Sequence, residues 1–203
     1  MTEISSLADL RQVYAQPSEL AVRKELDHID RHSRAFIARA PFVVIATADA
    51  QGWPDVSPRG DAPGFVGVVD DKRLHLPDRP GNNRLDSFQN LLGNGKIALL
   101  FVVPGRLETL RVNGTARLLK DPELLARYAV AGKPARAVVE VAAASVYFQC
   151  GKALIRSALW QTEQWPSLDG LASFAQALSD QIKGLDKVAS EVRLEKAYRE
   201  TLY

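Results

Sequence analysis

The stretch Pro54–Gly64 concentrates residue types that could hold a small polar ligand. It reads Pro-Asp-Val-Ser-Pro-Arg-Gly-Asp-Ala-Pro-Gly and lies between two apolar runs typical of strands. Ser57, Arg59 and Asp61 alternate along one side of an extended chain, so a hydroxyl, a cation and a carboxylate would face the same way. The alternative is an edge strand interrupted by proline, with Arg59 and Asp61 simply solvated. This stretch alone leaves both interpretations open.

A second candidate site, for an anion, lies in the turn-rich stretch Pro77–Asp86. It leads into a helix expected from Arg84 to about Leu92, which Asn82 or Asn83 would cap. The backbone N–H groups at a helix start lack partners, and together with the helix dipole and Arg84 they would form a phosphate site. An ordinary capped helix after a tight turn is the alternative, and it is favoured when this segment is taken alone.

Other kinds of chemistry lack support in this sequence. No nucleophile–base pair, zinc-ligand spacing, or Walker or Rossmann glycine pattern is present. His28 and His32 are four residues apart but have no third ligand nearby, so they are expected on a solvated helix face rather than at a metal. His75 is expected to point away from its strand neighbours Leu74 and Leu76 and to be structural.

Composition narrows the class of protein. The 203 residues suit one domain, and 46% hydrophobic and 25% charged residues are globular values. A net charge of +2, spread along the chain, argues against a nucleic-acid partner. Cys150 is the single cysteine, which excludes an internal disulfide. With no signal peptide and no run near the ~18 apolar residues of a membrane span, we expect a cytoplasmic protein that does not enter the membrane.

The elements that must position the candidate residues follow from periodicity. Ser18 is expected to cap one helix that ends before Pro41 and carries apolar residues at Leu26, Ile29, Phe36 and Ile37. Strands are expected at 42–48, at 107–118 and from 137 to about 149, with a hairpin at 65–76 and a helix from Asp121. Further helices at 167–179 and 186–203 would cap the β core.

The run Ile97–Val103 is unbroken and apolar, which predicts a strand buried on both faces. In an antiparallel sheet a partner subunit is the economical cover for the second face. Along the strand 107–118, Thr109 and Arg111 belong to a polar face that could be merely wet or could form the wall of a ligand cleft. The pattern alone therefore predicts a dimeric β-barrel-like domain of six to seven strands with an anion site.

Four motifs in order, the first running from Phe36 to Phe65, resemble the pyridoxamine 5′-phosphate oxidase-like family of FMN-binding split β-barrels, in particular its branch of uncharacterised bacterial flavoproteins. They span about residues 20 to 160 and read Phe36-Ile, Ser57-Pro-Arg-Gly-Asp61 with Pro63-Gly-Phe65, Pro77-Asp-Arg-Pro-Gly-Asn-Asn-Arg84, Glu108-Thr-Leu-Arg-Val-Asn-Gly114 and Cys150-Gly-Lys-Ala-Leu-Ile-Arg156. The resemblance implies an α+β fold, mainly an antiparallel split β-barrel with N-terminal, connecting and C-terminal helices. It also implies a homodimer with FMN at the subunit interface.

The resemblance further implies which residues hold FMN. Ser57 and Arg59 would lie near the ring edge or the phosphate, and Pro77 and Asp78 would pass by the ring. The phosphate would be held by Asn82, Asn83 and Arg84, and Thr109 and Arg111 would contact the ring or the ribityl chain. The second subunit would close the cleft with Gln149, Lys152, Arg156 and Trp160. For Trp160 the alternative is a buried side chain with no role at the cleft.

One departure from the family bears on function. Oxidases that make pyridoxal 5′-phosphate usually end in a tryptophan followed by an Arg-Leu-x-Pro segment that grips the substrate, whereas this chain ends Lys196-Ala-Tyr-Arg-Glu-Thr-Leu-Tyr203. We therefore expect an FMN-dependent oxidoreductase of another small substrate, with no catalytic side chain identified. A non-catalytic FMN-binding or sensing module and, ranked lower, a haem-binding or haem-degrading protein are the alternatives.

The expected organisation is a single FMN-binding split-barrel domain over residues 1–203. It consists of an N-terminal helical segment (1–40), the barrel (41–150) and a C-terminal helical segment (151–203).

Overall fold

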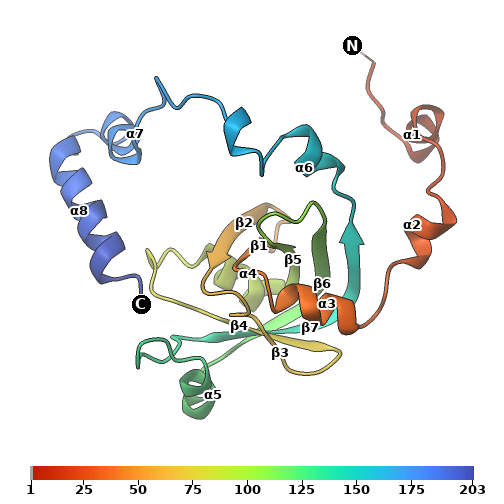
Figure 1. The fold of residues 1–203 in the computed structure, drawn as a ribbon, viewed down its shortest axis with the longest axis horizontal. Helices are drawn as coiled ribbons and strands as arrows, with labels where there is room; N and C mark the ends of the chain where they lie inside the picture. The colour runs from red at the N-terminus through yellow and green to blue at the C-terminus, as the bar shows by residue number, and fades with distance from the viewer. Residues whose placement is uncertain (1) are drawn as a thin grey trace.

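The computed structural model describes residues 2–203 and is built on one seven-stranded antiparallel sheet (Figure 1). The strand order is β2-β1-β5-β6-β7-β4-β3, so β2 and β3 are edges and the barrel is split rather than closed. The strands are β1 (Phe42–Ala48), β2 (Pro54–Gly60), β3 (Gly67–Val68), β4 (Arg73–Pro77), β5 (Lys96–Val102), β6 (Thr109–Leu119) and β7 (Val138–Gln149). The predicted fold class, an α+β split barrel, is confirmed.

Alternating side chains explain the core. Val43 and Ile45 on β1 are fully buried and lie opposite Phe101 and Leu99 of β5, which are buried with them. The intervening residues of β5, among them Leu100, are only half-buried in this chain. Nothing within residues 2–203 covers the outer face completely, so burial of this strand on both faces stays a prediction that requires a partner subunit.

Residues 2–203 also form eight α-helices and one 3-10 helix. They are α1 (Leu7–Val13), α2 (Glu19–Arg23), α3 (Arg31–Ile37), α4 (Asp86–Asn94), α5 (Pro122–Arg127), α6 (Lys152–Arg156), η1 (Thr162–Gln164), α7 (Phe174–Gln181) and α8 (Lys187–Glu200). Figure 1 shows α1, α2 and α6 extending away from the sheet, and none of these three helices contains a buried residue.

The single helix expected after Ser18 is wrong, because a connection to the sheet interrupts it. Ser18 caps only α2, and the chain then exchanges backbone hydrogen bonds between Leu26 and Val146 of β7, at 2.9 and 2.8 Å. Asp30 caps a new helix, α3, by accepting a hydrogen bond from the Ser33 N–H at 2.8 Å. The extended backbone at Leu26 cannot be helical at the same time, so tertiary pairing overrides the helical spacing.

The C-terminal helices differ from expectation in length and in position. The two expected helices shrink to α7 and α8, which pack on each other and lie apart from the sheet in Figure 1. They do not cap the β core. The chain end nevertheless returns to the sheet, where Tyr203 reaches Asp61.

Candidate functional site

A cleft of about 540 Å³ opens between edge strand β2, the segment that follows β4, and the start of α4. It contains most of the polar residues from the first two candidate stretches. Seven of the expected site residues line it, namely Ser57, Arg59, Pro77, Asp78, Asn82, Asn83 and Arg84. The structure therefore brings together seven residues that the sequence places in two separate segments.

Strand β2 supplies one wall of the cleft. Asp55, Ser57 and Arg59 line it and are half-buried, whereas Pro58 and Gly60 line it at exposed positions. Arg59 donates hydrogen bonds to the Ser57 hydroxyl and to the Pro58 carbonyl oxygen. The two interpretations of this stretch are thus both partly right, since it is a proline-containing edge strand and also a cleft wall.

Asp61 is not solvated, contrary to the alternative interpretation. Its side chain is 3% exposed, and its Oδ2 accepts a hydrogen bond from Arg79 Nε at 2.8 Å within an ion pair. Burial disfavours the charged carboxylate, but hydrogen bonds from the Ala62 N–H, Arg79 and the Tyr203 hydroxyl outweigh burial and lower the pKa of Asp61. Asp61 therefore fixes Arg79 in the cleft wall as a charged pair.

The start of α4 differs from the expected Asn cap. Leu85, in a left-handed conformation at φ 61°, occupies the N-cap position, and no side chain caps the helix. Asn82 instead accepts a hydrogen bond from the Arg84 N–H at 3.0 Å, and Asn83 accepts one from Arg136 Nη1 at 3.0 Å. In this nine-residue helix the Phe88 N–H donates to the Leu85 carbonyl oxygen at 3.0 Å, while the N–H groups of Asp86 and Ser87 have no partner within residues 2–203.

The cleft is basic, and part of its positive charge has no carboxylate partner. Arg84 pairs with Asp86, and Arg79 pairs with Asp61. Arg59 and Arg136 line the same cleft, and neither forms an ion pair within residues 2–203. Two guanidinium groups and an uncapped helix start thus converge on one volume, which suits an anion.

Asp78 is the cleft carboxylate that makes no hydrogen bond or ion pair with another side chain of residues 2–203. Its main chain is fixed to the start of β7 by hydrogen bonds with Ala137 (2.8 Å) and Arg136 (3.2 Å). Burial raises the pKa of Asp78, and the positive charges of Arg59, Arg136 and Arg79 offset only part of that effect. This carboxyl group is therefore the one best suited to hold a proton in the cleft.

The remaining expected residues lie outside the cleft of the same chain. Thr109 and Gln149 face each other across β6 and β7, and Arg111 donates to the Tyr147 hydroxyl at 2.9 Å. Trp160 Nε1 donates to the Arg106 carbonyl oxygen at 2.8 Å. The others, Lys152 and Arg156, are exposed on α6. Any role for these six residues at the cleft stays a prediction that requires a second copy of the chain.

Several cleft residues were absent from the expected site, among them Phe65, Arg79, Arg136 and Tyr203. Arg79 lies inside the recognised Pro77–Arg84 motif and could have been chosen for its charge, whereas Phe65 follows directly after the first stretch. No local signal marks Arg136 or Tyr203, which reach the cleft from the segment that precedes β7 and from the segment that follows α8.

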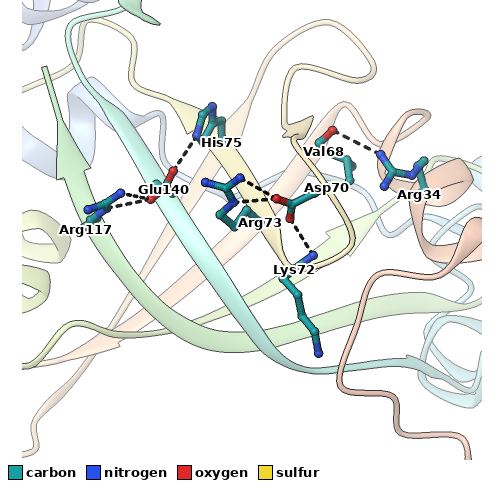
Figure 2. A network of polar contacts seen from close by, with 8 residues as sticks. All are labelled: Arg34, Val68, Asp70, Lys72, Arg73, His75, Arg117 and Glu140. Atoms are coloured by element: carbon teal, nitrogen blue, oxygen red, sulfur yellow. Dashed lines mark hydrogen bonds and ion pairs between the residues drawn. The ribbon is translucent and has the colours of Figure 1, made fainter. Parts of the chain in front are cut away.

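The histidines do not form a metal site in the described part of the chain. His75 is buried within β4, like both its neighbours, and lies between the Tyr128 hydroxyl (3.0 Å) and Glu140 Oε2 (3.1 Å). Figure 2 shows Glu140 bridging His75 and Arg117 across the strands. Burial opposes ionisation of Glu140, but the hydrogen bonds from His75 and Arg117 prevail and lower its pKa. His75 is thus structural and, as expected, lies on the opposite face of β4 from Leu74 and Leu76: these two pack in the core with Val139 and Val141, whereas His75 is paired with Glu140.

Two further observations concern residues 2–203 as a whole. No group of three or more His, Cys, Asp or Glu side chains is placed to hold a metal ion. None of the helices combines the length and the apolar character needed to span a membrane.

Comparison with solved structures finds distant similarity. HupZ of Group A Streptococcus is 24% identical, with 60% of this chain and 94% of that chain covered and a TM-score of 0.49. An FMN-binding protein of Syntrophomonas wolfei is 12% identical (70% and 95% covered, TM-score 0.43). HutZ, a haem storage protein of Vibrio cholerae, is 12% identical (60% and 94% covered, TM-score 0.42). Similarity at this level does not indicate what the present chain binds.

No match was found among curated proteins. The sequence profile of one protein family, described as pyridoxamine 5′-phosphate oxidase, matches residues 29–150. This range contains every strand of the split barrel and the segments that form most of the cleft. Because the match covers more than half of the 203 residues, the chain belongs to the pyridoxamine 5′-phosphate oxidase family.

Proposed function

We propose that the cleft binds FMN and that the protein is an FMN-dependent oxidoreductase acting on a small molecule. The observation that carries this proposal is the pair of arginines without carboxylate partners, Arg59 and Arg136, in the same cleft as the uncapped start of α4. A phosphate dianion suits such a site, because guanidinium groups and helix N–H groups both donate charge-assisted hydrogen bonds. Membership of the family supports the choice of FMN among phosphate-bearing ligands.

The cleft also fits the rest of the cofactor. Its volume of about 540 Å³ lies within the usual range for small-molecule sites. Phe65, Pro77 and Phe88 line it and offer apolar surface for a flat ring, while Arg59, Arg84 and Arg136 would hold the phosphate. When bound, FMN would supply the redox chemistry by accepting a hydride at N5. Asp78 would hold a proton beside the bound group.

The assembly that completes the site is proposed to be a homodimer. The outer face of β1 and β5, including Val44, Ala46 and Leu100, is half-buried in the single chain. A second copy packed on this face would cover it. The same copy would then be the source of the expected contacts from residues 149 to 160. Residues 1–203 would act as one FMN-binding unit within this dimer.

The visible spectrum of the purified protein is the first test. A yellow protein that releases FMN on denaturation supports the proposal, whereas a colourless protein that does not quench the fluorescence of added FMN contradicts it. Arg136→Ala should weaken FMN binding about tenfold or more, the loss expected for one hydrogen bond to a charged group. Arg23→Ala is the matched control, since Arg23 pairs only with Glu19 on an exposed helix.

Turnover separates the oxidoreductase from a non-catalytic flavin-binding module. Sustained consumption of reduced nicotinamide or oxygen over many turnovers would exclude a simple sensor, and single-turnover reduction alone would favour it. Haem binding is not proposed, because none of the three histidines lines the cleft and both ring nitrogens of the buried His75 are already engaged by Tyr128 and Glu140.

A further inference from the structure

Tyr203 lines both the cleft and a smaller neighbouring cavity. Leu202 and Tyr203 belong to the wall of the cleft, although α7 and α8, which precede them, lie apart from the sheet (Figure 1). Tyr203 also lines the second cavity, of about 280 Å³, whose other lining residues are Arg79, Pro80, Lys133, Pro134 and Arg136. Tyr203 is thus one of four residues shared by the two volumes, together with Arg79, Pro80 and Arg136, and the smaller cavity is lined by three cations and no acid.

Three contacts hold Tyr203 in position, and each involves a different part of the residue. The phenolic hydroxyl donates a hydrogen bond to Asp61 Oδ1 at 2.9 Å. The main-chain oxygen accepts a hydrogen bond from Lys133 Nζ at 2.8 Å. The guanidinium carbon of Arg79 lies over the ring, 5.9 Å from its centroid. Contacts of three kinds on one residue indicate a defined position rather than a loose chain end.

Few hydrogen bonds nevertheless hold Tyr203 in this position. Within the described part of the chain, the hydrogen bonds of Tyr203 to Asp61 and Lys133 are those that connect residues 166–203 with residues 2–158. Lys133 and Tyr203 both remain partly accessible to water, and α8 ends just before the tail, with Thr201 as its C-cap. Segments held by a few solvent-exposed hydrogen bonds open at low free-energy cost.

We propose that Leu202 and Tyr203 form a displaceable strap across the cleft, and that the seated Tyr203 limits the rate at which a ligand enters and leaves. When the strap lifts, the cleft opens on the side of the basic cavity, with which it shares Arg79, Pro80 and Arg136, and Lys133 loses its main-chain acceptor. The identity of the ligand as FMN rests on the proposed function, but the strap itself does not.

A digestion assay tests the strap without flavin. Carboxypeptidase should release Tyr203 from the 203-residue chain only when the tail is unseated. Tyr203→Phe removes the hydrogen bond to Asp61, and release should accelerate up to about tenfold. Lys133→Met should act in the same direction through the other anchor. Tyr198→Phe is the matched control, because Tyr198 lies exposed on α8 and makes no hydrogen bond to the sheet.

Peptides of residues 198–203 ending in tyrosine or phenylalanine correct for the preference of the carboxypeptidase. If, after this correction, the Tyr203→Phe and Lys133→Met chains lose their last residue no faster than the unmodified chain, the strap does not exist.

Stopped-flow binding of FMN then tests the gating. Tyr203→Phe should raise the association and dissociation rate constants together, each up to about tenfold, with little change in Kd. Unchanged rate constants alongside faster digestion would overturn the gating, since the tail would then lie off the path of the ligand. If the unmodified chain does not bind FMN, the proposed function fails, while the digestion assay still decides whether the strap exists.

Discussion

The ion pair between Asp61 and Arg79 supports the sharpest prediction about the stability of the cleft. Asp61→Asn keeps the size of the side chain but removes its charge, so Arg79 loses its partner while remaining 16% exposed. Asn Oδ1 can still accept hydrogen bonds from the Ala62 N–H and Tyr203, but an amide NH₂ facing Arg79 Nε would place two donors together.

The magnitude follows from burial. Breaking a buried pair by removing one partner costs roughly 3–5 kcal/mol, because a buried charge is left uncompensated. Arg79 retains a hydrogen bond to the Tyr128 carbonyl oxygen at 2.7 Å and some contact with water. We therefore expect the lower end of the range, about 3 kcal/mol of unfolding free energy at pH 7.

Urea denaturation of matched variants provides the assay. Asp86→Asn makes the same substitution in the same cleft, but Asp86 is 43% and Arg84 77% exposed, so this loss should stay below about 1 kcal/mol. Tyr203→Phe measures the part of the Asp61 effect that comes from the tail. The reasoning fails if Asp61→Asn is no more destabilising than Asp86→Asn.

The loss of stability caused by Asp61→Asn should depend on pH. The folded-state pKa of Asp61 lies below its ordinary value of 3.8. The stability that Asp61 contributes is therefore complete above pH 3.8 and is lost as the pH falls through the folded-state pKa. The difference in stability between the unmodified protein and Asp61→Asn should accordingly shrink on acidification below about pH 4. A constant difference down to pH 2 would show that charge is not the cause.

Two other perturbations test the packing. Leu100→Glu should convert the proposed dimer into monomers in sedimentation experiments. Leu92→Glu is the control, because Leu92 is exposed on α4, and it should not affect the dimer. A Leu100→Glu protein that is stable and dimeric would place the interface elsewhere. Gly114→Ala should destabilise the sheet severely, because an added Cβ would lie 1.9 Å from the Ala142 carbonyl oxygen at the bulge between β6 and β7. Gly93→Ala, where α4 has open space, should instead stabilise by about 0.5–1 kcal/mol in thermal unfolding.

Local pattern was sufficient for most of the sheet. The run 42–48 gives β1 with the expected bounds, because its alternate residues, such as Val43 and Ile45, are buried on one face. The polar and apolar faces of β6 likewise follow from alternation alone. Burial on one face of a strand is a property of neighbouring residues in sequence, so it can be read without knowing the rest of the fold.

Contacts between distant segments account for what was missed. Leu26 joins β7 at Val146, which no helical periodicity near Leu26 could indicate. Asn82 looked like a helix cap, yet its side chain closes a local turn onto the Arg84 N–H, and Leu85 takes the cap position. Tyr203 reaches Asp61 across 142 positions of sequence. Each error arises where a tertiary or turn-specific hydrogen bond competes with an intrinsic helix signal.

Whether the cleft is a complete binding site depends on whether the chain forms a dimer. One protomer supplies a basic cleft with seven of the expected residues, while the other six lie on β6, β7 and the α6 region outside it. The helices that extend away from the sheet carry large apolar side chains, such as Leu7 and Leu20, that the single chain leaves exposed. A dimer that buries these arms and the outer face of β5 is the arrangement that could also bring Lys152 or Arg156 to a neighbouring cleft. Leu100→Glu should then lose FMN affinity together with the dimer, although Leu100 does not line the cleft. Retained affinity in the monomer would mean that the single-chain cleft is the whole site.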